Sequence, residues 1–287
     1  MGRVDEPALV SQRHHELTAA DGTTLYVADY LLPRAQARGS VVVMHGLGEH
    51  SGRYRHIAQF FNECGLSVRT YDHRGHGRSS GARGDVIHGD PMVQDAEIVL
   101  DDFAASFDAP PFLFGHSMGG LFACRFALSR LSPLSGLILS SPALSVRLSG
   151  LEMTMLNTLD RFLPWLGVPN GLKVDKLSHR SDVVAAYKAD PLVHGKISAR
   201  LLRSMLGSID YCQSHAAQLT VPALIVAAGD DHLVDAEGSK RFHASAPASL
   251  CELRMYPGLY HEIFNENGAE APFEDVRQWL LPRLPAA

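Results

Sequence analysis

Hydrophobic and polar positions follow two patterns along this chain. Short runs of consecutive apolar residues are typical of buried strands, and longer segments with apolar residues at helical spacing are typical of amphipathic helices. These patterns predict strands at 40–46, 66–72, 111–115, 134–141, 221–229 and 250–257, and helices at about 53–64, 91–107 and 118–130. Two further strand-like runs, within residues 14–32, flank Asp21-Gly22 and predict a hairpin.

The alternation of strands with helices predicts a mostly parallel sheet with helices on both faces. In such sheets the ligand crevice lies outside the carboxyl ends of the strands. His45, Asp72, Ser117 and Asp231 each follow a strand-like run closely. We therefore expect these four side chains to gather at one edge of the sheet, where a site could form.

The strand–helix alternation stops after Ser141 and returns at residue 221. We therefore divide the chain into a core, formed by residues 1–142 and 221–287, and an insertion at the ligand edge, residues 143–220, which is a candidate lid. A stripe in this insertion has helical spacing; it consists of Met155, Leu156, Leu159, Phe162, Leu163 and Leu166. The stripe could pack in the core, line an acyl pocket or contact lipid, and these interpretations stay open.

Composition excludes some classes of function. The chain is 46% hydrophobic and 20% charged, with a net charge of -5 and no basic run, so nucleic-acid binding is not expected. Four separated cysteines without a CxxC pair predict buried free thiols rather than a disulfide or a zinc site. The first ten residues lack the apolar stretch of a secretory signal, and no segment is long and apolar enough for a membrane span. We expect a cytoplasmic protein.

The segment Gly115-His116-Ser117-Met118-Gly119 carries the first candidate chemistry. It follows an apolar strand and opens a helix, as a nucleophile elbow of the GxSxG type requires. The alternative is that Ser117 merely caps the helix. A helix cap does not need glycine on both sides, whereas a tight turn packed against its neighbours does. The pattern therefore favours Ser117 as a nucleophile, with the N–H of Met118 directed at the developing oxyanion.

A serine hydroxyl needs a base, and the base needs an acid that orients it. For this arrangement the chain order is serine, acid, histidine. The acid should follow a late strand, where Asp230 and Asp231 are candidates that position alone does not separate; Asp235 is expected to cap the next helix. His261 lies in the loop after the following strand and is the candidate base.

Several longer motifs carry a resemblance to a known family. They are HGLGEHSGRY (45–54), YDHRGHGRSSGARG (71–84), GHSMGG (115–120), DPLVH (190–194), GDDHLVD (229–235) and GLYHEIFNE (258–266). With them the chain resembles the α/β-hydrolase family, in particular its monoacylglycerol lipase and lysophospholipase branch. The resemblance implies a mostly parallel central sheet with helices on both faces and a helical cap, here residues 143–220.

The resemblance also implies roles for particular residues. Ser117 would be the nucleophile, Asp231 rather than Asp230 the orienting acid, and His261 the base. The backbone N–H groups of Leu47 and Met118 would form the oxyanion hole. Glu49 and Arg53 would lie near the polar end of the site, although a salt bridge that fixes their loop is an equal alternative. The candidate contacts of the acyl chain are Met155, Leu159 and Phe162.

The expected reaction is hydrolysis of monoacylglycerols to fatty acid and glycerol through an acyl-serine, with no metal or cofactor. A lysophospholipase or a broad-specificity esterase is the alternative that keeps the same chemistry. A hydrolase scaffold that binds a lipid or a partner without turnover is the alternative of another class. The expected partner is a small lipid ester, and transient contact of the cap with a membrane or micelle is also expected.

Overall fold

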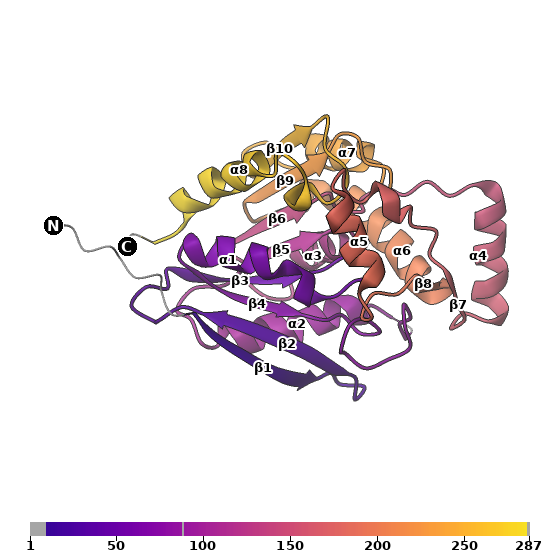
Figure 1. Ribbon diagram of the computed structural model, residues 1–287, viewed down its shortest axis with the longest axis horizontal. Coiled ribbons are helices and arrows are strands. Elements are labelled where there is room, and N and C mark those ends of the chain that lie inside the picture. Colours follow the sequence, from indigo (N-terminus) through magenta and orange to yellow (C-terminus); the bar gives the residue numbers. More distant parts are fainter. Residues whose placement is uncertain (1–9, 88, 286–287) are drawn as a thin grey trace.

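The computed structural model describes residues 10–87 and 89–285, so the interpretation of the N-terminal ten residues falls almost wholly outside it. Its central feature is an eight-stranded sheet with the order β1-β2-β4-β3-β5-β6-β9-β10 (Figure 1). The strands are β1 (Ser11–Thr18), β2 (Thr24–Leu31), β3 (Gly39–Met44), β4 (Leu66–Tyr71), β5 (Phe112–His116), β6 (Gly136–Ser140), β9 (Ala223–Ala228) and β10 (Cys251–Tyr256).

In this sheet β4, β3, β5, β6, β9 and β10 are parallel to one another, whereas the pairs β1–β2 and β2–β4 are antiparallel. The hairpin between β1 and β2 turns at the expected place: Gly22 has φ 84°, and the Asp21 carboxylate accepts the N–H of Thr23 at 3.0 Å. The prediction of a mostly parallel sheet is thus confirmed, and its boundaries differ from the predicted ones by only a few residues.

Alternate residues of the buried strands face opposite layers of helices. Val41 and Val43 pack in one hydrophobic cluster, whereas Val42 and Met44 pack in another. The first cluster contains α1 (Arg55–Glu63) and α8 (Glu270–Leu280); the second contains α2 (Pro91–Ala104), α3 (Met118–Ser129) and α7 (Glu237–Ser245). Both faces of the sheet are therefore covered, which explains why its strands read as continuous apolar runs. All four cysteines are buried free thiols, as expected.

The segment between β6 and β9, which are neighbours in the sheet, holds α4 (Gly150–Phe162), β7 (Gly167–Pro169), α5 (Ser181–Ala189), β8 (Lys196–Ser198) and α6 (Ala199–His215). Short 3-10 turns complete the chain: η1 (Ser51–Tyr54), η2 (Val174–Lys176), η3 (Ala216–Gln218), η4 (Ile263–Asn265) and η5 (Leu281–Arg283).

The inserted elements differ in how closely they join the core. α6 packs against α3 and shares its buried cluster through Leu201 and Met205. By contrast, α4 lies at the outer side of the insertion, is joined to α6 by the ion pair of Asp160 with Arg203, and buries only Leu156 (Figure 1). A capping box between Ser149 and Glu152 starts α4. The sequence pattern did not predict α6 or the antiparallel pair β7–β8.

Candidate active site

Ser117 occupies a strained turn between β5 and α3. Its backbone has φ 54° and ψ -118°, a conformation that a residue with a side chain rarely adopts and that stores strain. Backbone hydrogen bonds hold the turn: the N–H of Ser117 donates to Ser140, and its carbonyl accepts from Leu121 and Ala143, each at 3.0 Å. The hydroxyl makes no capping hydrogen bond to α3, so the alternative of a plain helix cap is wrong.

The glycines around Ser117 let the turn approach its neighbours. A Cβ at Gly115 would lie 2.4 Å from the carbonyl oxygen of Gly119. A Cβ at Gly119 would lie 2.4 Å from two carbonyl oxygens at the end of β3, and one at Gly120 would lie 2.9 Å from Pro142. Because backbone cannot give way as a flexible side chain can, these positions require glycine. The turn is thus fixed by close packing on both sides.

Asp231 and His261 form a buried pair at the same edge of the sheet. The Nδ1 of His261 lies 2.7 Å from the Oδ2 of Asp231, and the other carboxylate oxygen accepts the N–H groups of Leu233 and Val234 at 2.8 and 3.0 Å. Burial opposes the charge on Asp231, but His261 and these hydrogen bonds outweigh it and lower the pKa of the carboxyl.

Burial also lowers the pKa of the His261 imidazole, but the Asp231 carboxylate, with Glu262 and Glu49, outweighs this effect. The pKa of His261 is therefore raised above its ordinary value. The neighbouring imidazole of His116 lies 4.7 Å away between ring centres, and burial together with His261 lowers its pKa to about 4. His116 is thus neutral near pH 7, whereas His261 is poised to take up a proton.

The other two acid candidates have different partners. Asp230 is half-exposed and lies 3.1 Å from the Nε2 of His232. The carboxylate of Asp235 pairs with Arg147 at 3.1 Å and also accepts the N–H of Glu237 at 3.3 Å, at the start of α7. The geometry therefore brings only one of the three aspartates to the histidine of the next loop.

A cavity of about 210 Å³ joins these groups. Ser117 and His261 line it, as do Leu47 and Met118. Among the residues that the structure describes, the N–H groups of Leu47 and Met118 donate no hydrogen bond, so both are free for a ligand oxygen. Most of the wall is apolar and comes from the insertion and from the loops after the strands: Ala143, Val146, Leu148, Leu172, Leu177, Ile197, Leu202, Met205, Leu233 and Val234.

One part of the cavity wall, which we call the polar end, is polar. It consists of Glu49, His116, Asn170, Tyr187 and Glu262. Arg53 is not part of this wall: its guanidinium lies behind Glu49 and contacts a smaller adjoining cavity of about 20 Å³. Sequence reasoning missed Glu262, although it directly follows the histidine that the motif GLYHEIFNE had singled out.

The three predicted acyl contacts lie elsewhere. Met155, Leu159 and Phe162 are on α4 and do not line the cavity, and Phe162 is 65% exposed. Within α4, Leu156 is the buried residue and Glu152 is the one that lines the cavity, while the apolar wall comes from other segments. The exposed apolar side chains on and after α4 include Leu151, Met155, Phe162 and Trp165. Within the stripe Leu156 is packed inward, and none of the stripe residues lines the cavity.

The cavity continues to the surface along the loop of Asp231. A surface groove shares its lining with the cavity at Arg147, Glu152, Gly171, Leu172, Leu233 and Val234. In the described part of the chain, no group of three or more His, Cys, Asp or Glu side chains is arranged to hold a metal ion. Within residues 10–87 and 89–285, none of the helices combines the length and the hydropathy needed to span a bilayer.

Comparison with known proteins supports the interpretation of this site as a catalytic one. A family model described as serine aminopeptidase, S33, matches residues 35–268. The chain is 36% identical over 278 residues to a monoacylglycerol lipase of Mycolicibacterium smegmatis, a match that covers 96% of this chain and 99% of the relative. It is also 34% identical over 241 residues to the phospholipase YtpA of Bacillus subtilis, covering 83% of this chain and 93% of the relative.

A solved structure is similar over most of the chain. The crystal structure of the monoacylglycerol lipase of Paleococcus ferrophilus superimposes with a TM-score of 0.81 at 34% sequence identity, covering 90% of this chain and 99% of the other. The likeness thus extends over the sheet, its helices and the inserted segment together.

Proposed function

The chain belongs to the serine aminopeptidase, S33, family and has the α/β-hydrolase fold, and we propose that it cleaves monoacylglycerols to a fatty acid and glycerol. It is a lipase-like carboxylic-ester hydrolase. The observation that carries the proposal is that a serine on a strained turn and a buried Asp231–His261 pair open onto one mostly apolar cavity. Such a cavity suits an ester with a long acyl chain.

In the first half of the reaction, Nε2 of His261 takes the proton of the Ser117 hydroxyl as its oxygen attacks the ester carbonyl. The N–H groups of Leu47 and Met118 donate to the oxyanion that develops. The resulting imidazolium is stabilised by Asp231, whose carboxylate stays charged. The imidazolium then gives its proton to the leaving glycerol oxygen, and the acyl group stays on Ser117.

In the second half, a water molecule takes the place of the alcohol. Nε2 of His261 removes a proton from this water, the hydroxyl attacks the acyl carbonyl, and the oxyanion forms again between the same two N–H groups. Collapse returns the proton to the Ser117 oxygen and releases the fatty acid. Each proton that leaves serine or water is thus delivered to the departing oxygen, so the cycle closes without a cofactor.

The charge of the polar end supports an uncharged alcohol as the leaving group. The buried carboxylates of Glu49 and Glu262 face this end, and a single guanidinium, that of Arg53, is shared between them. Because like charges repel strongly where water is scarce, a phosphate placed here would be disfavoured. Glycerol instead brings hydroxyl groups that can donate to carboxylates. Lysophospholipid remains the alternative substrate, and the similarity to a phospholipase supports it.

The exposed apolar side chains of α4 and the segment after it support transient contact with a lipid surface. Leu151 is 80% exposed and Trp165 is 55% exposed. Exposure of apolar surface to water is unfavourable, and contact with a membrane or micelle would remove this unfavourable free energy. Glu152, one turn into the same helix, lines the groove that leads to the cavity. A lipid surface bound by α4 would therefore lie beside the entrance through which its own molecules enter.

The proposed function is tested by three substrates with the same acyl chain: a 2-monoacylglycerol, a lysophosphatidylcholine and an acyl amide of a small amine. We expect fast turnover of the monoacylglycerol and none above background with Ser117→Ala, which should stay folded by circular dichroism. Preference for lysophosphatidylcholine would show that monoacylglycerol is not the substrate. Preference for the amide would show that the protein is not an ester hydrolase. Activity that survives Ser117→Ala would show that Ser117 is not the nucleophile.

A further inference from the structure

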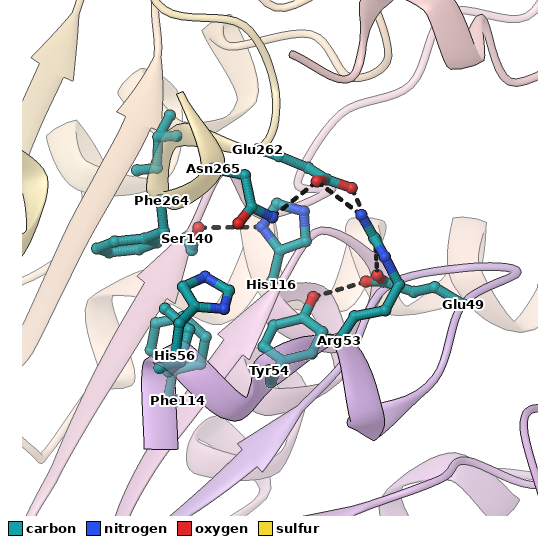
Figure 2. Close-up of a pocket in the computed structure, with 12 residues that line it drawn as sticks. Glu49, Arg53, Tyr54, His56, Phe114, His116, Ser140, Glu262, Phe264 and Asn265 are labelled. Carbon is teal, nitrogen blue, oxygen red and sulfur yellow. Dashed lines mark hydrogen bonds and ion pairs between the residues drawn. The ribbon is translucent and has the colours of Figure 1, made fainter. Parts of the chain in front are cut away.

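A buried ion network begins at the polar end of the cavity and extends away from it (Figure 2). It consists of Glu49, Arg53, Tyr54, Glu262 and Asn265, and we call it the Arg53 network. The network joins two loops that are far apart in the sequence, through Glu49 in one and Glu262 in the other. One is the oxyanion loop (residues 45–50), which carries the N–H of Leu47; the other is the base loop (residues 257–262), which carries His261.

Glu49 fixes the oxyanion loop from within. Its Oε1 accepts the N–H of Gly46 at 2.7 Å and the hydroxyl of Tyr54 at 2.6 Å, while its Oε2 binds Arg53. Gly46 immediately precedes Leu47, so the carboxylate is bonded to the peptide next to the one that would bind the oxyanion. A Cβ at Gly46 would lie only 2.8 Å from Oε1, which shows how closely the carboxylate approaches this loop.

Arg53 connects that carboxylate to the base loop. Its Nη1 donates to Oε1 of Glu262 at 2.8 Å and its Nη2 to Oε2 at 2.9 Å, a two-pronged contact, and Nη1 also binds Glu49. Asn265 donates to Oε2 of Glu262 at 2.8 Å and completes the far side. Figure 2 shows the Arg53 guanidinium between the two carboxylates. Such planar, bidentate contacts fix orientation as well as distance.

The network also reaches the insertion. The Arg53 guanidinium lies 4.8 Å from the ring centre of Tyr187 on α5, and the ring of Tyr187 lines the cavity. The N–H of Glu262 donates to the carbonyl of Leu177, another residue of the insertion, at 2.9 Å. One guanidinium is therefore in contact with all three parts of the protein that surround the polar end of the cavity.

We propose that Arg53 is a positioning residue for ester hydrolysis, which through Glu49 and Glu262 holds the oxyanion loop in register with the base loop. The inference rests on the proposed function, because it assumes that Leu47 and His261 act in one reaction. The physical reason is that the oxyanion donor and the base must keep their separation to within about 0.5 Å, although no covalent link or sheet hydrogen bond joins their loops.

The network carries charge as well as geometry, and the two effects can be separated. His261 lies in the field of the Asp231, Glu262 and Glu49 carboxylates and next to the neutral His116, and Arg53 is paired with two of these carboxylates. Loss of Arg53 leaves two carboxylates without their cation, which favours the imidazolium and moves the acid limb of the rate profile to higher pH. Loss of the Glu262 charge has the opposite effect. Removing both restores the original net charge but not the bridge.

The experiment compares Arg53→Met, Glu262→Gln, the double variant and Arg53→Lys for monoacylglycerol hydrolysis from pH 5 to 9. For Arg53→Met we expect kcat to fall by about 10- to 100-fold, as for a small misplacement of reacting groups, with an acid limb at higher pH. Glu262→Gln should move this limb to lower pH. The double variant should return the limb to its original position while kcat stays low, and Arg53→Lys should keep the limb but lose rate.

Arg69→Met is the matched control. Arg69 is also a buried guanidinium between two carboxylates, at 2.7 Å from Asp29 and 2.6 Å from Asp102, and none of the three lines the cavity. We expect Arg69→Met to lower the melting temperature without a shift of the acid limb. If Arg53→Met resembled it in rate and in pH profile, or if the double variant regained full kcat, the proposal would be overturned.

The rate of Ser117 labelling by a fluorophosphonate is measured on the same variants, since it depends on the serine, the base and the oxyanion hole but not on the natural ester. If monoacylglycerol is not hydrolysed but labelling shows the expected pattern, the proposed substrate fails and the positioning role stands. If monoacylglycerol is hydrolysed but the variants show no such pattern, the positioning role fails alone. A wild-type chain that is not labelled would overturn both. Should Arg53→Met not fold, Arg53→Lys and the double variant decide.

Discussion

Replacement of Asp231 by asparagine tests the assignment of the acid most directly, because the structure dictates how the amide would lie. Two backbone N–H groups, of Leu233 and Val234, point at Oδ1 of Asp231. In the variant these donors require an acceptor, so the amide oxygen takes that position. The amide NH₂ group then takes the place of Oδ2 and faces Nδ1 of His261.

The consequence is a change of tautomer. Nδ1 of His261 must now accept a hydrogen bond, so the ring proton moves to Nε2, the nitrogen that has to be bare to take the proton of Ser117. We expect kcat to fall by about 10⁴, equivalent to about 5 kcal/mol of transition-state stabilisation. The free energy of unfolding should change by only about 1 kcal/mol, because the three hydrogen bonds of the side chain persist in number.

The assay measures kcat for a monoacylglycerol with Asp231→Asn and, as control, with Asp230→Asn, and the melting temperature of both. Asp230 is half-exposed and pairs with His232, so its variant should keep activity within about twofold, as for other exposed pairs. Asp231 is not the orienting acid if Asp231→Asn retains a tenth of the wild-type kcat, or if Asp230→Asn is the variant that loses activity.

Three further predictions concern packing, pH and lipid. Gly119→Ala should destabilise the protein by about 1–3 kcal/mol in urea unfolding, because its Cβ would lie 2.4 Å from backbone oxygens. Gly207 is the control, since it lies on an exposed part of α6 with open space around it. Gly207→Ala should stabilise the protein by about 0.5–1 kcal/mol. Log kcat/KM should fall with unit slope on the acid side, with a midpoint above about 6.5, because the pKa of His261 is raised and its protonated form cannot act as base; a midpoint below this value would contradict the environment described here. Leu151→Ser with Phe162→Ser should reduce sedimentation with phosphatidylcholine vesicles but leave hydrolysis of a short, water-soluble ester unchanged; equal losses in both assays would argue against a lipid-binding role of α4.

The core of the fold was predictable because each strand carries its own signal. A strand buried on both faces, such as β3 with Val41, Val42 and Val43, reads as an apolar run, and glycine or a polar residue marks its end. The insertion was less predictable. The signal of α6 is weakened by Ser204, Gly207 and Ser208 in its interior, which are poor helix formers, and the three-residue strands β7 and β8 have no pattern of their own.

The same distinction holds for the site. Ser117 and His261 follow strands in a fixed chain order, so their positions at the sheet edge are implied by the sequence. The ion pair of Arg53 with Glu262 is not implied by the sequence. The two residues are 209 positions apart, and neither belongs to a pattern that predicts contact with the other. The acyl wall was also missed, because the stripe on α4 has the spacing of a packed helix face and nothing in the sequence says whether a partner covers it.

The buried charges at the polar end impose opposite demands on the base and on the substrate. Glu49, Glu262 and Asp231 together favour the imidazolium of His261, which helps the attack but extends the range of pH over which the base is already protonated. Arg53 offsets part of this field, so it sets how far the acid limb rises. The same field disfavours an anionic headgroup next to the ester. The carboxylates of the network that fixes the oxyanion loop can therefore also accept hydrogen bonds from the hydroxyl groups of a neutral alcohol. The same residues thus serve both the position of the loop and the binding of the leaving group.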